Sequence, residues 1–252
     1  MGLLARPPRG IVNFLVYRVM HAATVHMERK TSTMMTMKSP TKEVPILIVF
    51  GKPGAGKTTI TNEAFQKLGL ESRICLVLDL DVCIPQWMKD NFATQIYPTL
   101  AQRHEFALTA CQYVEEQIQC SRNERKEMNG DFDCGVLISF SFVNTDLRQV
   151  FREKFPHAVW ALIDVSNELA QERIRQRQDH FYKVSEPKEK ESQNTLESNS
   201  DGEMPKQKQS DWEFCQVDFD HILLDGKDSI QVNASKVSDT FKSLFETSRQ
   251  ND

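Results

Sequence analysis

The sequence of 252 residues contains no apolar run of about 18 residues, the length that a membrane-spanning helix requires. No transmembrane helix and no membrane partner are therefore expected. The six cysteines are scattered and form no Cys-x-x-Cys pair, which argues against both a zinc site and a disulfide framework. Free thiols in a reducing compartment are the simplest expectation.

A strong excess of either charge sign is also missing. The formal net charge is −4, so the chain has no overall electrostatic attraction to nucleic acid, and no nucleic-acid partner is expected. Hydrophobic residues make up 40% and charged residues 26%, which is ordinary for a globular protein. The length suits one α/β domain with a sizeable core and some additional tail.

Acidic residues are nearly missing from residues 1–42, where Glu28 stands alone among seven lysines and arginines. A basic, acid-poor segment that contains threonine is typical of an organelle transit peptide. Two alternatives remain open, a disordered leader or a later start among the methionines of this region (Met27, Met34, Met35 and Met37). The expected location is cytoplasmic, or the mitochondrion or plastid if this extension is a transit peptide.

From residue 43 onward, apolar runs alternate with segments of helical periodicity. Strands are expected at 44–50, 73–81, 134–142, 158–165 and 220–225, and helices at 59–69, 85–97, 99–120, 146–155, 166–178 and from 230 to 244. Continuously apolar strands between helices predict an α/β fold with a parallel sheet covered on both faces. The domain is expected over 43–247, with a polar, disordered insertion at 184–212.

Residues 51–58 read Gly-Lys-Pro-Gly-Ala-Gly-Lys-Thr and match the phosphate-binding loop (P-loop) pattern G-x-x-x-x-G-K-[ST] at every fixed position. Glycines let backbone N–H groups face a phosphate chain, and the helix that follows adds a favourable dipole. We expect ATP as the cofactor, with Lys57 on its phosphates and Thr58 on Mg²⁺. The expected nucleotide-binding residues of this loop are Gly51, Gly54, Ala55, Gly56, Lys57, Thr58 and Thr59.

The acidic residues that accompany this loop narrow the class of P-loop protein. The sequence has no guanine-reading Asn-Lys-x-Asp, and the third expected strand ends without the aspartate that motor and transporter ATPases usually carry there. Instead, Asp79 and Asp81 end the second strand, where i, i+2 spacing predicts both carboxylates on one side. We expect Asp79 to order the water shell of Mg²⁺ and Asp81 to orient or deprotonate an acceptor hydroxyl. Alternatively, one of them caps the following turn.

Arginines gather at the end of the helix expected at 166–178. Such side chains can neutralise charge that develops on a transferred phosphoryl group, so Arg177 is a candidate catalytic residue and Arg173 a candidate nucleotide-binding residue. The alternative is a solvated helix C-terminus, which the helix dipole also favours.

With these features the segment from about 46 to 182 resembles the small P-loop metabolite kinases of the shikimate-kinase-like group, and gluconate kinases within it. Residues 78–81, Leu-Asp-Leu-Asp, resemble the family's Leu-Asp-Gly-Asp substrate and magnesium element. The residues that match its lid are Arg173, Arg177, His180, Phe181 and Tyr182, and those that match two further motifs are Arg103, Ser141, Arg148 and Arg152. The chain departs from the family at Asn144 and Thr145, which replace a basic residue, and at Asp179, which replaces the lid glycine.

This resemblance implies a P-loop NTPase three-layer α/β/α sandwich with a five-stranded parallel sheet of order 2-3-1-4-5. It also implies ATP-dependent phosphorylation of a sugar acid or a similar small hydroxylated metabolite, and a possible homodimer. Arg103 and Arg148 are then candidates to bind a substrate anion, beside Asp81, because guanidinium groups match planar anions. Two alternatives remain: a nucleoside, nucleotide or polynucleotide kinase, and an ATP-binding regulatory or scaffold protein without phosphotransfer.

Overall fold

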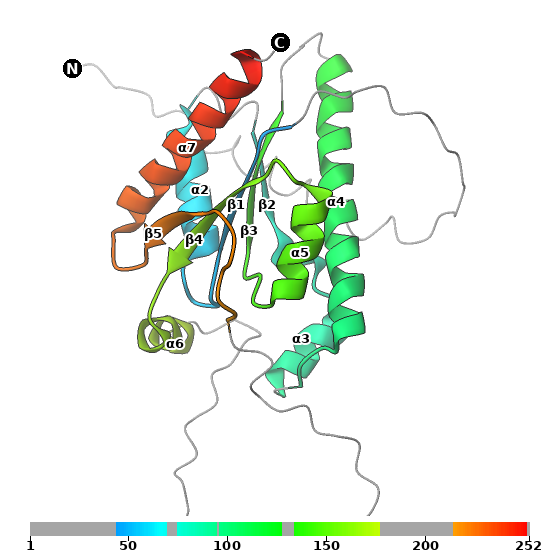
Figure 1. Cartoon of the computed structure of the whole chain (residues 1–252), viewed down its shortest axis with the longest axis vertical. Helices are drawn as coiled ribbons and strands as arrows, with labels where there is room; N and C mark the ends of the chain where they lie inside the picture. The colour runs from blue at the N-terminus through cyan, green and yellow to red at the C-terminus, as the bar shows by residue number, and fades with distance from the viewer. Residues whose placement is uncertain (1–43, 70–74, 95, 128–133, 177–213, 251–252) are drawn as a thin grey trace, which may run out of the picture. The chain divides into compact units, whose positions relative to one another are not determined.

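The computed structural model describes residues 44–69, 75–94, 96–127, 134–176 and 214–250. These residues form a five-stranded sheet with helices on both faces (Figure 1). The predicted N-terminal extension (1–42) and the predicted insertion (184–212) lie outside the described residues, so both interpretations stay predictions.

The sheet has the order β2-β3-β1-β4-β5, and every neighbouring pair of strands is parallel. Its strands are β1 (Ile46–Gly51), β2 (Cys75–Asp79), β3 (Gly135–Phe140), β4 (Val159–Asp164) and β5 (Ile222–Asp225). The predicted fold class and strand order are thereby confirmed. The register pairs Phe50 with Phe140 and Asp79 with Ser139, so the carboxyl ends of β1, β2 and β3 lie at one edge of the sheet.

Strand β1 explains why both faces of the sheet are covered. Ile46, Ile48 and Phe50 belong to one buried cluster, and the alternate residues Leu47 and Val49 belong to the other. The first cluster lies beneath α4 (Leu100–Glu127) and α5 (Thr145–Lys154), and the second beneath α2 (Lys57–Lys67) and α7 (Ile230–Gln250) (Figure 1). The result is a three-layer α/β/α sandwich.

Helix α4 begins with a reciprocal cap. The hydroxyl of Thr99 accepts from the backbone N–H of Gln102 (3.3 Å), and the Gln102 side chain accepts from the N–H of Thr99 (2.9 Å). The helix continues to Glu127, seven residues beyond the predicted end, and Leu100 is 60% exposed although the pattern predicts it to be buried. The apolar residues that follow Leu100 on the same face at helical spacing are buried (Ala107, Cys111, Val114 and Ile118).

Two shorter helices lie near the carboxyl ends of the strands. Helix α3 (Gln86–Ala93) is shorter than predicted, and Pro85 is its N-cap rather than part of its first turn. Helix α6 (Asn167–Arg175) begins where predicted, because the Ser166 hydroxyl accepts from the N–H of Leu169 (3.3 Å). Both helices border the P-loop edge of the sheet, and this is where the site is built.

Candidate functional site

The P-loop connects β1 to α2 and depends on glycine for close approach to its neighbours. At Gly54 (φ 83°) a Cβ atom would lie 2.4 Å from the carbonyl oxygen of Ala170, and at Gly51 (φ 152°) 2.8 Å from that of Ile163. Gly56, also left-handed (φ 95°), is the N-cap of α2 and supplies no side-chain cap. The first turn of α2 contributes no acidic residue of its own, and the positive end of this helix at the loop favours a phosphate group.

Two lysines brace this loop. The Nζ atom of Lys57 donates to the carbonyl of Lys52 (2.9 Å), while Lys52 Nζ donates to Val165 (3.1 Å) and to Asn167 Oδ1 (2.7 Å). Lys57 therefore lies along the concave side of the loop, and Lys52 anchors the loop to the β4–α6 connection. Sequence reasoning missed the role of Lys52, because the P-loop pattern leaves its position unspecified.

The oxygen-bearing side chains of Thr58 and Asp79 meet across two elements. The Thr58 hydroxyl donates to Asp79 Oδ2 (2.7 Å), and Asp79 Oδ1 accepts from the N–H of Asp81 (3.1 Å). Hydroxyl and carboxylate oxygens at a P-loop suit Mg²⁺, which also takes phosphate and water oxygens. In the described part of the chain no group of three His, Cys, Asp or Glu side chains could hold a metal by itself. These residues therefore fit a metal that arrives with the nucleotide.

The conformation predicted for Asp79 and Asp81 is wrong. Strand β2 ends at Asp79, and Asp81 lies in the 3-10 turn η2 (Leu80–Cys83), so the two residues do not alternate along an extended strand. Asp79 caps this turn through the bond to Asp81, as the alternative interpretation predicts. Asp81 nevertheless reaches the P-loop edge, where it lines one pocket together with Lys57 and Thr58.

Cys83 lies beside these carboxylates. Burial, followed by the negative charges of Asp79 and Asp81, raises the pKa of the Cys83 thiol to about 12. Because this pKa lies above the unfolded value of about 8.5, the thiol contributes stability that is fully present below that value and is lost as the pH rises toward 12.

We expect the urea midpoint of the wild-type protein to fall between pH 9 and pH 11, and to fall less steeply in Cys83→Ala. Cys120→Ala, at an exposed position, should keep the wild-type slope.

The pocket beside Asp81 lies between the P-loop, η2, α3, the start of α4 and the loop after β3. Arg103, a predicted substrate residue, lies in its wall. Its Nε donates to Asp146 (2.8 Å) and its Nη1 to the carbonyl of Pro98 (3.0 Å), so an adjacent carboxylate already compensates the guanidinium charge. Two apolar side chains of this wall, Met88 and Phe106, were not predicted as site residues, because alone they resemble ordinary core positions, while Phe92 was expected to pack either in the core or at the substrate.

A second pocket lies on the other side of the P-loop and is lined by Gly56, Thr59, Arg173 and Gly226, among others. Arg173 extends from α6 and donates to the carbonyls of Ala55 (3.3 Å) and Gly226 (3.0 Å). The turn after β5 is held against the end of β4, because the N–H of Gly226 donates to the backbone carbonyl of Asp164 (2.7 Å). Arg173 thus joins the P-loop to this turn. Arg177, the other predicted arginine, lies outside the described residues.

The predicted substrate role of Arg148 requires correction. The residue is 1% exposed, and its guanidinium donates to four backbone carbonyls, those of Phe142 (2.8 Å), Val143 (3.1 Å), Cys215 (2.8 Å) and Gln216 (2.9 Å). A guanidinium committed in this way cannot also grip a substrate anion. Arg148 instead ties the loop after β3 to the segment that precedes β5.

The strand order and the P-loop between β1 and α2 define the P-loop NTPase three-layer α/β/α fold. A solved sugar kinase from Janibacter sp. HTCC2649 has this fold, with a TM-score of 0.52 at 18% identity over 81% of this chain and 98% of that one. A gluconokinase from Sinorhizobium meliloti 1021 gives a TM-score of 0.50 at 14% identity over 82% and 99%. No model of a known family and no curated protein matches the sequence. At these identities the likeness shows the fold.

None of the helices in the described residues is both long and apolar enough to cross a membrane.

Proposed function

We propose that the protein is an ATP-dependent kinase that phosphorylates a hydroxyl group of a small molecule. The contact between Thr58 and Asp79 (2.7 Å), with Asp81 in the adjoining pocket, carries this proposal. It joins a Mg²⁺ ligand pair to a carboxylate that can receive a hydroxyl proton. The names of the two similar structures, a sugar kinase and a gluconokinase, support the same class of reaction.

ATP, when bound, supplies the γ-phosphoryl group, and Mg²⁺ compensates part of its charge. Thr58 and Asp79 would hold the metal, the latter through water, and Lys57 would contact the phosphates. Asp81 would orient the acceptor hydroxyl and take its proton as the new O–P bond forms. The nucleoside would occupy the second pocket, beside Arg173. Positioning and charge compensation then account for most of the rate increase.

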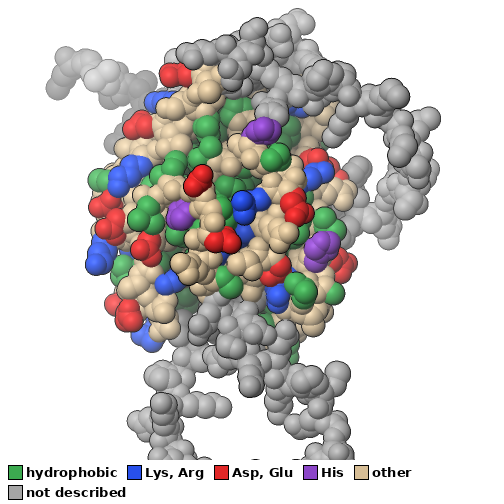
Figure 2. Space-filling view, viewed as in Figure 1, with side chains coloured by type: hydrophobic (Ala, Val, Ile, Leu, Met, Phe, Trp, Pro, Cys, Tyr) green, Lys and Arg blue, Asp and Glu red, His purple; other side chains and the backbone are tan. Residues whose placement is uncertain are grey.

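The resemblance to gluconate kinases puts sugar acids first among the acceptors to test. A polynucleotide acceptor has less support, because Lys and Arg side chains are interspersed with Asp and Glu on the face seen in Figure 2. A regulatory protein that binds ATP without transferring phosphate would keep the P-loop and have no use for the carboxylate of Asp81. An experiment on the Asp81 carboxylate therefore separates this regulatory alternative from a kinase.

Asp81→Asn should lower acceptor-dependent ADP release by about a hundredfold or more, because an amide cannot accept the hydroxyl proton. ATP affinity, measured by calorimetry, should change less than about twofold, since Asp81 is not assigned to the nucleotide. Asp90→Asn, an exposed carboxylate on α3 that bonds only Gln86 among the contacts described, is the matched control and should keep the wild-type rate. Tight ATP binding without transfer to any acceptor of a broad panel would favour the regulatory alternative.

A further inference from the structure

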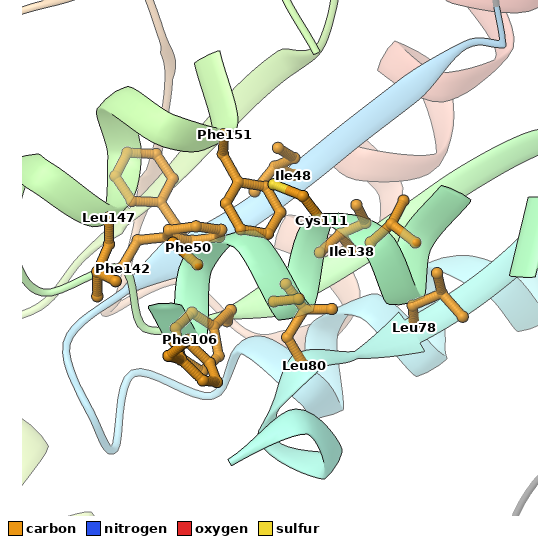
Figure 3. Close-up of a cluster of buried hydrophobic side chains, with 14 of the residues drawn as sticks. Ile48, Phe50, Leu78, Leu80, Phe106, Cys111, Ile138, Phe142, Leu147 and Phe151 are labelled. Atoms are coloured by element: carbon orange, nitrogen blue, oxygen red, sulfur yellow. The ribbon is translucent and has the colours of Figure 1, made fainter. Parts of the chain in front are cut away.

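The wall of the pocket beside Asp81 is built mainly from apolar side chains. Met88 and Phe92 come from α3, Phe106 from α4, Phe142 from the loop after β3, and Leu147 from α5. Each of them is 7% exposed or less, so the floor of the pocket is the end of the hydrophobic core. Figure 3 shows Phe106, Phe142 and Leu147 together at one end of that apolar cluster, away from Leu78.

Few groups in this wall can bond the hydroxyls of a polyol. Among the described lining residues outside the P-loop, the side chains that can form hydrogen bonds are Asp81, Arg103 and Ser141. A sugar acid carries a hydroxyl on almost every carbon, and each one buried without a partner opposes binding. Its carboxylate would meet Arg103, whose charge Asp146 already compensates. The chemistry of the wall therefore disfavours the acceptor class that the sequence resemblance suggests.

We propose that the acceptor is a neutral alcohol with an aromatic or alkyl body, which lies against this apolar wall with its hydroxyl at Asp81. Burial of such a body is favourable in proportion to its apolar area. The proposal rests on the proposed kinase function: the hydroxyl oxygen bonds to the γ-phosphorus, the bond from that phosphorus to ADP breaks, and the proton passes to Asp81. Three exposed apolar side chains, Val82, Trp87 and Ile96, lie near Met88 and Phe92 in the chain. A longer apolar body could contact them.

Calorimetry with the full chain, Mg²⁺ and a non-hydrolysable ATP analogue tests this acceptor class without requiring turnover. We expect 3-phenyl-1-propanol to bind at least ten times more tightly than gluconate, and glycerol, which is neutral but polar, to bind as weakly as gluconate. Gluconate affinity equal to or higher than that of the phenyl alcohol, or no binding of the phenyl alcohol, would overturn the proposal. Tight binding of the phenyl alcohol without ADP release from ATP would support the pocket assignment and overturn the kinase function instead.

Val143→Thr locates the bound alcohol, because this nearly isosteric change puts a hydroxyl on a pocket residue that is 5% exposed. Affinity for 3-phenyl-1-propanol should fall about fivefold, while affinity for the ATP analogue, which reports an intact fold, stays unchanged. Val232→Thr, on the exposed side of α7, should change neither affinity. Unchanged alcohol affinity in Val143→Thr would place the alcohol elsewhere and overturn the proposal.

Discussion

Lys57→Met should reduce acceptor-dependent ADP release on the order of a thousandfold, because it removes the cation that we propose contacts the phosphate chain. Methionine keeps most of the length of the side chain and removes its charge. Lys57 is only half-buried and lies outside both apolar clusters, so the thermal midpoint should stay within a few degrees of wild type. Coupled ADP release, titration with an ATP analogue and thermal unfolding measure these three quantities.

Lys67→Met is the matched control for this experiment. It makes the same substitution on the same helix, in the exposed last turn of α2, far along the helix from the P-loop. We expect wild-type turnover and wild-type ATP-analogue affinity. Wild-type phosphotransfer by Lys57→Met would contradict the kinase assignment, whereas equal losses in both variants would show that α2 itself is disturbed.

The P-loop edge is the part of the site that the sequence predicts well, because its determinants are local. The glycines at 51 and 54 follow from one octet, and the helix expected from 59 begins two residues earlier, at Lys57. The contact of Thr58 with Asp79 requires only that β2 ends and α2 begins at the same edge of a parallel sheet, which the alternation of strands and helices dictates. The order of the strands came instead from the family resemblance, since periodicity alone does not say which strands are neighbours.

Other features depend on contacts between distant segments, and the sequence does not encode them locally. Asp81 has the residue type that the pattern requires, yet the backbone turns at Leu80 because Asp79 caps a 3-10 turn. The apolar wall at Phe106 becomes part of a pocket only where α4 crosses the P-loop edge. Leu100 fits the helical stripe but precedes the part of α4 that the sheet covers. At these positions the sequence predicts a suitable residue type, but it does not predict the place of that residue in the fold.

Arg148 is the clearest example, because its partners lie both six residues before it and nearly seventy after it. The loop that it holds contains Phe142, a non-glycine residue with a left-handed backbone (φ 44°), a conformation that costs roughly 1 kcal/mol. The Phe142 ring packs between Phe151 (centroids 4.7 Å apart) and Trp160 (5.0 Å), and the Arg148 guanidinium also lies 4.6 Å from the ring centre of Phe214. Hydrogen bonds and packing together keep this loop in place.

Arg148→Ala should therefore lower the free energy of unfolding by about 3–5 kcal/mol, because four carbonyls lose a charged donor that is itself only 1% exposed, although the carbonyl of Val143 keeps the N–H of Cys215 (3.0 Å). Arg148→Lys keeps the charge but presents a single ammonium in place of the planar fork, so we expect a smaller loss of about 2 kcal/mol. Arg152→Ala makes the same truncation one turn later, at an exposed side chain over Phe219 (4.4 Å), and should cost about 1 kcal/mol or less. Urea unfolding of the three variants measures these differences.

The order of the three losses separates a backbone anchor from a generic helix arginine. If Arg148→Ala does not fold, the comparison of Arg148→Lys with Arg152→Ala still distinguishes the two roles. A surface arginine would tolerate lysine without loss of stability. Equal stability of Arg148→Lys and wild type would contradict the four-carbonyl role. Because Phe142 and Val143 line the proposed acceptor pocket, the loss of this anchor should also weaken acceptor binding more than ATP binding in any variant that folds. A loss of both affinities by the same factor would mean that Arg148 supports the whole fold rather than this loop.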